Sequence, residues 1–239
     1  MGCRRLLLYG LVNARDLGGF KTTEGKITRF NQYVRSEELS ELSSSDIELL
    51  IDYGIKHCID LRSHKQIENN PAPINNLTRI QYHVVDADTS FSENNEKRMN
   101  TKMFNPATWA DILFGMLDNQ SIWMGKAVEL LSSCGSGVLF SCNSGRNRSN
   151  LLALIVLSIA KVPYEDIVAD YATNEIYLKE FYKRCYLEGS HPASFYETPY
   201  YVMEDVIQRV LRKYGSFEDY LCYCGVSSDS IRRIYHTIV

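Results

Sequence analysis

Short apolar segments alternate with helix-like segments along the first 140 residues, and this alternation restricts the fold more than any other feature of the chain. The segments with the apolar runs typical of buried strands are 55–61, 79–85 and 137–140. The segments with helical caps and periodicity lie at about 43–54, 106–117 and 121–133. Strands that alternate with helices form a mainly parallel sheet covered by helices. We therefore expect an α/β fold, with a mostly parallel central sheet of about four or five strands flanked by helices.

From Asn150 onward the sequence predicts almost nothing but helices. Pro163 suits the first turn of one helix, where a missing N–H costs nothing. Ser216, and Ser227 or Ser228, are typical N-caps of the last two helices. No stretch has the composition of a linker, so we expect residues 1–239 to form a single domain that ends in a helical layer.

The composition is that of an ordinary globular protein and excludes several other classes. Of 239 residues, 45% are hydrophobic and 23% are charged, and the net charge is −3. A chain that binds nucleic acid through its phosphates needs a basic excess, so we expect no nucleic-acid partner. The longest apolar run, Leu151–Ala160, is well short of the ~18 residues that a bilayer crossing requires, so we expect no membrane span.

The chain has seven cysteines, an odd number without regular spacing, and Cys222 and Cys224 are too close for a zinc knuckle. Its five histidines show no spacing typical of metal ligands. We therefore expect no metal and no cofactor, and a reduced, cytoplasmic environment. Arg4-Arg5 followed by the apolar residues 6–12 is a weak signal-peptide pattern, so secretion stays open as an alternative.

Residues 140–149 join a short apolar strand to a strongly apolar helix and contain the pattern Cys-x5-Arg-Ser. A Gly-containing loop between a strand and a helix turns its backbone N–H groups inward, and the helix adds its positive end, so the loop can bind an anion. Arg148 can offer a planar, two-pronged contact to phosphate oxygens. The same positive surroundings favour a thiolate at Cys142 and make it a nucleophile. The alternative is a buried structural cysteine beside a solvated arginine.

This loop resembles the signature of the cysteine-dependent tyrosine phosphatases. The chain is similar to the branch of bacterial and fungal tyrosine/lipid phosphatases whose loop reads His-Cys-x-x-Gly-Lys-Asp-Arg-Thr-Gly. Near the N-terminus, residues 10–20 resemble the Asn-Phe-Arg-Asp-Leu-Gly-Gly-Tyr marker of that branch. The other segments that fit are 35–36, 60–63, 214–221 and 225–227. The likeness spans essentially the whole chain and implies a tyrosine phosphatase-like fold with a C-terminal helical lid over the active site.

The chain departs from the loop of that branch at five positions. Ser141 replaces the histidine that precedes the nucleophile, and Arg146 replaces lysine with the charge retained. Asn147 replaces the aspartate that is thought to serve as general acid in the branch, and an amide does not donate a proton usefully near neutral pH. Ser149-Asn150 replaces Thr-Gly, which keeps the hydroxyl. The departures leave the nucleophile and the phosphate contacts intact and leave the proton donor open.

Other candidate residues each have a functional and a structural interpretation. Asp86 and Asp88 follow a predicted strand, where many cysteine phosphatases carry a general acid, although solvated loop carboxylates are the more common case. Arg15 and Asp16 either support the phosphate loop or form a structural ion pair. Arg62 either supports the site or is a surface charge. The aromatic residues between Tyr177 and Tyr201 either line the lid or belong to the core.

The resemblance and the loop together predict a metal-free phosphomonoester hydrolase that acts through a cysteinyl-phosphate. Cys142 is the expected nucleophile, Arg148 holds the phosphate, and Ser149 hydrogen-bonds the thiolate as it leaves. The residues expected to bind phosphate are Asn143, Ser144, Gly145, Arg146, Asn147 and Arg148. The expected substrate is a phosphorylated protein or a phosphoinositide. The alternatives are an inositol-phosphate or phosphoinositide phosphatase, and a pseudophosphatase that binds phosphate groups with little turnover.

Overall fold

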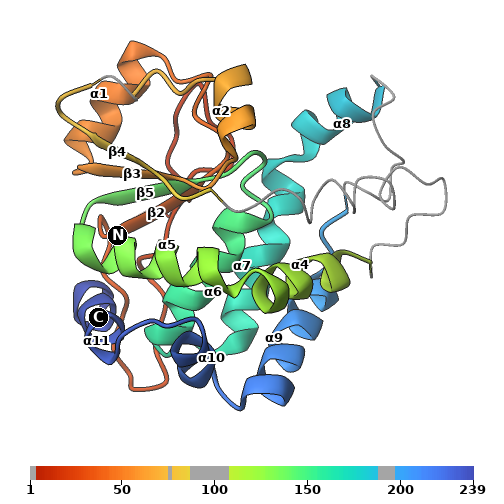
Figure 1. The fold of residues 1–239 in the computed structure, drawn as a ribbon. Helices are drawn as coiled ribbons and strands as arrows, with labels where there is room; N and C mark the ends of the chain where they lie inside the picture. Colours follow the sequence, from red (N-terminus) through yellow and green to blue (C-terminus); the bar gives the residue numbers. More distant parts are fainter. Residues whose placement is uncertain (1–3, 75–76, 87–107, 188–196) are drawn as a thin grey trace.

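A computed structural model describes residues 4–74, 77–86, 108–187 and 197–239, and it has the expected α/β architecture (Figure 1). The strands are β1 (Arg15–Asp16), β2 (Tyr33–Ser36), β3 (His57–Asp60), β4 (Gln81–Val84) and β5 (Val138–Ser141). The helices before and beside β5 are α1 (Ser44–Asp52), α2 (His64–Asn69), α4 (Thr108–Asn119), α5 (Ser121–Cys134) and α6 (Arg148–Ile159). The C-terminal helices are α7 (Tyr164–Tyr177), α8 (Lys179–Leu187), α9 (Tyr200–Tyr214), α10 (Phe217–Tyr223) and α11 (Ser228–Ile238).

The five strands form one sheet in the order β1-β2-β5-β3-β4, and all pairs except β1–β2 are parallel. Ser36 and Asp60 are both opposite Ser141, and Val84 is opposite Asp60. The four parallel strands therefore end at the same edge of the sheet. The loops that follow them meet at this edge, which is where α/β folds place their sites.

Each face of the sheet has its own hydrophobic core. Val34, Cys58 and Leu139 face one core, which α1 covers with Ile47 and Leu50. The neighbouring strand residues Tyr33, Ile59, Val138 and Phe140 face the larger core with α4, α5, α6 and the C-terminal helices. This division follows from the alternation of side chains along a strand. In Figure 1, α1 lies on one side of the sheet and α5 and α6 lie on the other.

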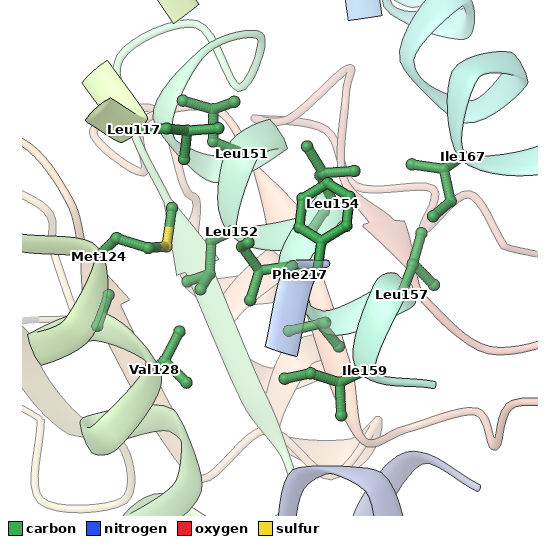
Figure 2. Close-up of a cluster of buried hydrophobic side chains, with 14 of the residues drawn as sticks. Leu117, Met124, Val128, Leu151, Leu152, Leu154, Leu157, Ile159, Ile167 and Phe217 are labelled. Carbon is green, nitrogen blue, oxygen red and sulfur yellow. The ribbon is translucent and has the colours of Figure 1, made fainter. Parts of the chain in front are cut away.

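Helix α6 lies at the centre of the larger core, as Figure 2 shows for Leu151, Leu152, Leu154 and Leu157. Side chains from α4, α5, α7 and α10 surround it: Leu117, Met124, Val128, Ile167 and Phe217. A helix that is apolar on all sides is stable only when it is buried all round. Truncating one of these leucines to alanine typically costs about 2–5 kcal/mol. The helix that begins at the phosphate loop is therefore anchored along its whole length.

The expected helix caps are confirmed at Ser43, Ser216 and Ser227, each of which accepts a hydrogen bond from a backbone N–H three residues on. Pro163 is the N-cap residue of α7 rather than its first helical residue. Sequence reasoning did not predict α2, which buries none of its side chains and so has no apolar periodicity.

The structure also bears on two further expectations, the absence of a membrane span and the presence of a lid. Within the described residues, none of the helices combines the length and the apolar character that a bilayer crossing requires. The predicted lid, Tyr177–Tyr201, is described only in part, because residues 188–196 lie outside the described residues. Within the described part, Tyr182 is buried, whereas Phe181, Tyr200 and Tyr201 are exposed.

Candidate active site

The loop between β5 and α6 places Cys142 at its base. Cys142 follows the last residue of β5 and is 1% exposed. Its Sγ lies 3.3 Å from Ser149 Oγ, which is within hydrogen-bonding distance for sulfur. Ser149 is in the first turn of α6, whose first backbone N–H groups have no partner within the helix. The thiol therefore lies between a hydroxyl and the positive end of a helix dipole.

Gly145 allows the loop to pack against the segment after β2. Its φ of +69° is in the left-handed region. A Cβ at this position would lie 2.8 Å from the Glu37 backbone nitrogen and 2.9 Å from Asn13 Nδ2, both too close. The backbone N–H of Glu38 also donates to the carbonyl of Asn143 at 3.1 Å. The shape of the loop therefore depends on glycine and on the close approach of residues 36–38.

Arg148 is the first residue of α6, and its side chain reaches the carboxyl end of β3. It donates to the Leu61 carbonyl at 2.8 Å and to Gln66 Oε1 at 3.0 Å. Gln66 is itself held in the capping box of α2 with Ser63. These contacts fix the plane of the guanidinium and leave further N–H groups of Arg148 for phosphate oxygens.

Behind the loop lies a buried cluster of charged and amide side chains, of which sequence reasoning singled out only Arg15. The carbonyl of Gly145 accepts a hydrogen bond from Arg35 at 2.7 Å. Arg35 also donates to Asp170 at 2.8 Å and to Asn174 Oδ1 at 2.8 Å. Arg15 contacts the same Asp170 carboxylate at 3.3 Å and donates to Asn13 Oδ1. The loop therefore rests on two buried arginines that share one carboxylate.

Burial and the neighbouring charges shift the pKa values of two residues in this cluster, Arg35 and Asp170. Burial and the neighbouring charge of Arg15 lower the pKa of Arg35 to about 9, against the opposing effects of Asp170 and Cys142. Burial alone would raise the pKa of Asp170, but Arg15, Arg35 and Arg4 outweigh it and hold the pKa below its usual 3.8. Asp170 is therefore a carboxylate whose charge is stabilised by its partners.

The structural interpretation of Arg15 and Asp16 as an ion pair with each other is wrong. Asp16 instead accepts hydrogen bonds from the backbone N–H groups of Gly18 and Asn31 and from the hydroxyl of Tyr53. Burial is the main cause of its raised pKa. The two side chains point to opposite faces of the sheet because they are neighbours along β1, so only Arg15 is directed toward the loop.

Arg62 is buried, so the interpretation of this residue as a surface charge is wrong. It pairs with Asp60 at 2.8 Å and with Glu38 at 2.9 Å. Glu38 carries the backbone N–H that holds Asn143, so Arg62 is linked to the loop through Glu38. Arg146 is also buried, and its guanidinium lies 4.1 Å from the centre of the Trp109 ring. Its charge is therefore held against an aromatic face of α4.

The two aspartates considered as proton donors differ in what the structure describes. Asp86 follows β4 at the same edge of the sheet as the loop and contacts His64 Nδ1 at 2.7 Å. Asp88 lies outside the described residues. Among the described residues, Asn147 Oδ1 and Ser141 Oγ are buried without a hydrogen-bond partner. Both positions are departures from the loop pattern of the similar phosphatases.

A cavity of about 690 Å³ lies beside the loop. Asn143 and Ser144 form part of its wall, and Tyr177 and Phe181 from α7 and α8 form another part. Five carboxylic residues line it: Glu37, Glu38, Glu41, Asp46 and Glu180. The predicted lid aromatics therefore include two residues that border an opening next to the loop, rather than being core throughout.

The supporting residues that sequence reasoning missed are separated widely along the chain. Arg35 and Asp170 are 135 residues apart, and no local pattern connects them. One signal was present: Asp170 and Asn174 are four residues apart on α7, so they share a helix face. That face carries two buried polar side chains, which is unusual for a helix that packs against a core.

Comparisons with known proteins agree with this geometry. The chain is 24% identical over 215 residues to a tyrosine-protein phosphatase of Nostoc commune, a match that covers 84% of this chain and 72% of the other. It is 27% identical over 169 residues to a putative tyrosine-protein phosphatase of Cupriavidus necator, which covers 66% of this chain and 59% of the other. Residues 6–239 match the tyrosine phosphatase family. The chain therefore belongs to the tyrosine phosphatase family, whose members are cysteine-dependent phosphatases.

Proposed function

We propose that the chain hydrolyses phosphomonoesters through a covalent cysteinyl-phosphate on Cys142. The observation that carries this proposal is the position of the Cys142 thiol at the base of the loop, 3.3 Å from Ser149 and at the start of α6. The thiolate attacks phosphorus, a P–S bond forms, and the bond from phosphorus to the leaving oxygen breaks. Water then attacks the phosphoenzyme, the P–S bond breaks, and inorganic phosphate leaves.

The loop backbone and Arg148 hold the phosphate during both steps. The N–H groups of residues 143–148 and the N-terminus of α6 stabilise the charge that spreads over the equatorial oxygens. Arg148 adds a planar contact from a guanidinium that Leu61 and Gln66 already orient. Because Arg35 fixes the Gly145 carbonyl from behind, the loop needs little rearrangement when phosphate binds.

Ser149 acts in the second step. Its hydroxyl stabilises the Cys142 thiolate as the P–S bond breaks, because a hydrogen bond to the charged form favours that form. The loop also retains the positive charge of Arg146, whose guanidinium lies over the ring of Trp109.

The proton for the leaving group has no donor within the loop, because Asn147 has replaced the aspartate of similar phosphatases. General acid help is typically worth ~10²–10⁴ in rate. An aryl oxygen with a low pKa leaves without a proton, whereas the oxygen of tyrosine needs one far more. Asp86, at the same sheet edge, is the substitute donor that we propose. If it does not act, the protein turns over slowly and approaches a phosphate-binding pseudophosphatase.

The surroundings of the loop favour a phosphotyrosine-bearing peptide over a phosphoinositide. Five carboxylic residues line the neighbouring cavity, and the described residues that line it include no lysine or arginine. Glu38 is paired with Arg62, and Asp46 is buried in the cap of α1. The exposed Glu41 and Glu180 therefore supply most of the charge that repels an inositol ring with several phosphates and attracts basic residues that flank a phosphotyrosine. The names of the two relatives, both tyrosine-protein phosphatases, support the same substrate class.

Hydrolysis of para-nitrophenyl phosphate tests the proposal. Cys142→Ser should abolish turnover while vanadate still binds, and Arg148→Lys should cost at least about 100-fold because an ammonium cannot replace the planar contact. Cys222→Ser, at an exposed cysteine, is the matched control and should keep full activity. A Cys142→Ser variant with a tenth of the parental rate would exclude the mechanism. A panel of phosphotyrosine peptides and phosphoinositides then decides between the two substrate classes.

A further inference from the structure

Two histidines and a cysteine meet at a point that the phosphatase mechanism does not use. His57 Nδ1 lies 3.4 Å from His83 Nε2, and His83 Nε2 lies 3.9 Å from Cys134 Sγ. All three of these atoms lie within 4.8 Å of one another, and each residue is half-buried. The three residues are 26 and 51 positions apart along the chain, so their spacing gave no sign of a common site.

Rigid elements hold the three side chains. His57 is the first residue of β3, and His83 is opposite Ile59 on the neighbouring strand β4. His57 and Ile59 share one face of the sheet, so His57 and His83 are diagonal neighbours on that face. Cys134 is the last residue of α5, which packs on β3. The sheet register and the end of a helix therefore bring the three side chains to one place before any ligand binds.

The distances suit a tetrahedral zinc ion. With Zn–N bonds of about 2.05 Å and Zn–S bonds of about 2.3 Å, tetrahedral angles place two nitrogens about 3.4 Å apart and a nitrogen and sulfur about 3.6 Å apart. Here the two nitrogens are 3.4 Å apart and His83 Nε2 lies 3.9 Å from Cys134 Sγ, whereas the third pair, His57 and Cys134, lies within 4.8 Å, so His57 and Cys134 move closer together when the ion binds. Two imidazoles and one thiolate are also ligands that zinc prefers over the hard cations.

We propose that His57, His83 and Cys134 form a zinc site with three protein ligands, whose fourth position is open to water. Binding displaces the proton of the Cys134 thiol and uses the lone pairs of His57 Nδ1 and His83 Nε2. The ion ties β3, β4 and α5 together and so stabilises the edge of the sheet.

The site is separate from the phosphate loop. His57 is opposite Val138 at the start of β5, whereas Cys142 lies four residues further on, beyond the end of that strand. At roughly 3.3 Å per residue the two sites are about 13 Å apart along the strands. Zinc at this site is therefore no part of the phosphoryl transfer, and its removal leaves that chemistry in place.

Titration of the metal-stripped, thiol-reduced full chain with Co²⁺ tests the site, because four-coordinate Co²⁺ with a thiolate ligand has characteristic visible and near-ultraviolet absorption. We expect one equivalent to bind with that spectrum and Zn²⁺ to displace it. Zn²⁺ at about 100 times its Kd should also raise the thermal unfolding midpoint by about 5 °C or more. His83→Ala and Cys134→Ser should each weaken binding by at least about 100-fold, beyond the 10–100-fold typical of outer-shell partners.

Two controls separate this site from other thiols and histidines. Cys222→Ser and His64→Ala change exposed residues that are outside the cluster, and both variants should bind Co²⁺ as the parent does. Circular dichroism checks that the variants fold, and His83→Gln replaces His83→Ala if the latter does not. The proposal is overturned if the Co²⁺ spectrum persists in both ligand variants, or if the parent binds no Zn²⁺ at free concentrations up to about 100 μM.

Discussion

Arg35 donates a hydrogen bond at 2.7 Å to the backbone carbonyl of Gly145, 110 residues later in the chain. Gly145 is in the phosphate loop, and Arg35 is in the middle of a parallel strand at 0% exposure. Among the described residues, its other hydrogen-bond and ion-pair partners are Asp170 and Asn174 on α7. The loop therefore takes its position from a strand and a helix that contribute nothing directly to the chemistry.

Removing the charge of Asp170 should destabilise the protein strongly. Asp170→Asn leaves Arg15 and Arg35 buried without their shared carboxylate, and breaking a buried pair in this way costs about 3–5 kcal/mol in the free energy of unfolding. Urea unfolding at pH 7 measures the change. Asp205→Asn is the control, because its pair with Arg209 is half-exposed and should be worth no more than about 1 kcal/mol. Equal effects of the two substitutions would refute the role assigned to the cluster.

The same variant has a predictable pH dependence. In the folded protein the pKa of Asp170 is below 3.8, the ordinary value for an aspartate. The stabilisation that the Asp170 carboxylate contributes is therefore fully present above pH 3.8. The contribution is lost as the pH falls through the lower folded pKa. The difference in unfolding free energy between the parent and Asp170→Asn should therefore narrow as the pH decreases below about 4. A difference that stays constant down to pH 2 would contradict the assignment.

Adding a methyl group at Gly145 should impair phosphate binding more than stability alone explains. Gly145→Ala forces a Cβ to within 2.8 Å of the Glu37 nitrogen. Gly25→Ala is a matched control, since Gly25 has a φ of +80° but nothing within 4 Å of its Cβ position. Both substitutions carry the ~1–2 kcal/mol backbone cost of a left-handed residue. Vanadate affinity should fall at least about 10-fold in Gly145→Ala and stay unchanged in Gly25→Ala. An equal loss of affinity in both variants would show that backbone strain, and not the contact with Glu37, causes the effect.

The missing loop acid should be visible in the dependence of rate on leaving group. Because Asp86 already supplies the proton in this account, we expect Asn147→Asp to raise kcat/KM for phosphotyrosine by about 10²-fold or more only in an Asp86→Asn background, with little change for para-nitrophenyl phosphate. Asp86→Asn should lower the rate only with poor leaving groups. A series of aryl phosphates measures both effects as the slope against leaving-group pKa. If neither variant changes the slope, the account of proton transfer is wrong.

The acidic wall of the cavity should select basic phosphopeptides. Glu41 and Glu180 are exposed on this wall, and neutralising both as Glu41→Gln and Glu180→Gln should reduce the preference for a peptide with flanking lysines by up to about 10-fold. The preference should also weaken with added salt. Glu175→Gln, exposed on α7 outside the cavity wall, serves as control. Unchanged preference in the double variant would show that the wall does not contact the peptide.

Patterns within a few consecutive residues predicted much of this structure, whereas they did not predict contacts between segments that are distant in the sequence. Ser43 was predicted as an N-cap because capping depends on residues within one turn. Strand β2 was not predicted, because its Arg35 is charged and yet buried. Arg62 was open to interpretation as a surface charge for the same reason: its partners Asp60 and Glu38 are needed to explain its burial.

The loop itself was predictable because the residues expected to carry out its chemistry are consecutive in the sequence. Cys142 to Ser149 carries the nucleophile, the glycine turn and the phosphate contacts within one segment. Apart from Arg15, the side chains that support the loop were not predicted, since Asn13, Arg35, Asp170 and Asn174 come from three separate parts of the chain. The grouping of His57, His83 and Cys134 was not predicted for the same reason, because these residues are far apart in the sequence.

The most direct test of the central claim is detection of phosphate on Cys142 during turnover. The parent and Ser149→Ala are mixed with para-nitrophenyl phosphate, quenched in acid, digested and analysed by mass spectrometry. We predict that the peptide containing Cys142 gains the mass of one phosphoryl group. The modified fraction should be larger in Ser149→Ala, because loss of the Ser149 hydrogen bond slows departure of the thiolate. Turnover without phosphate on Cys142, or with phosphate on another residue, would contradict the account.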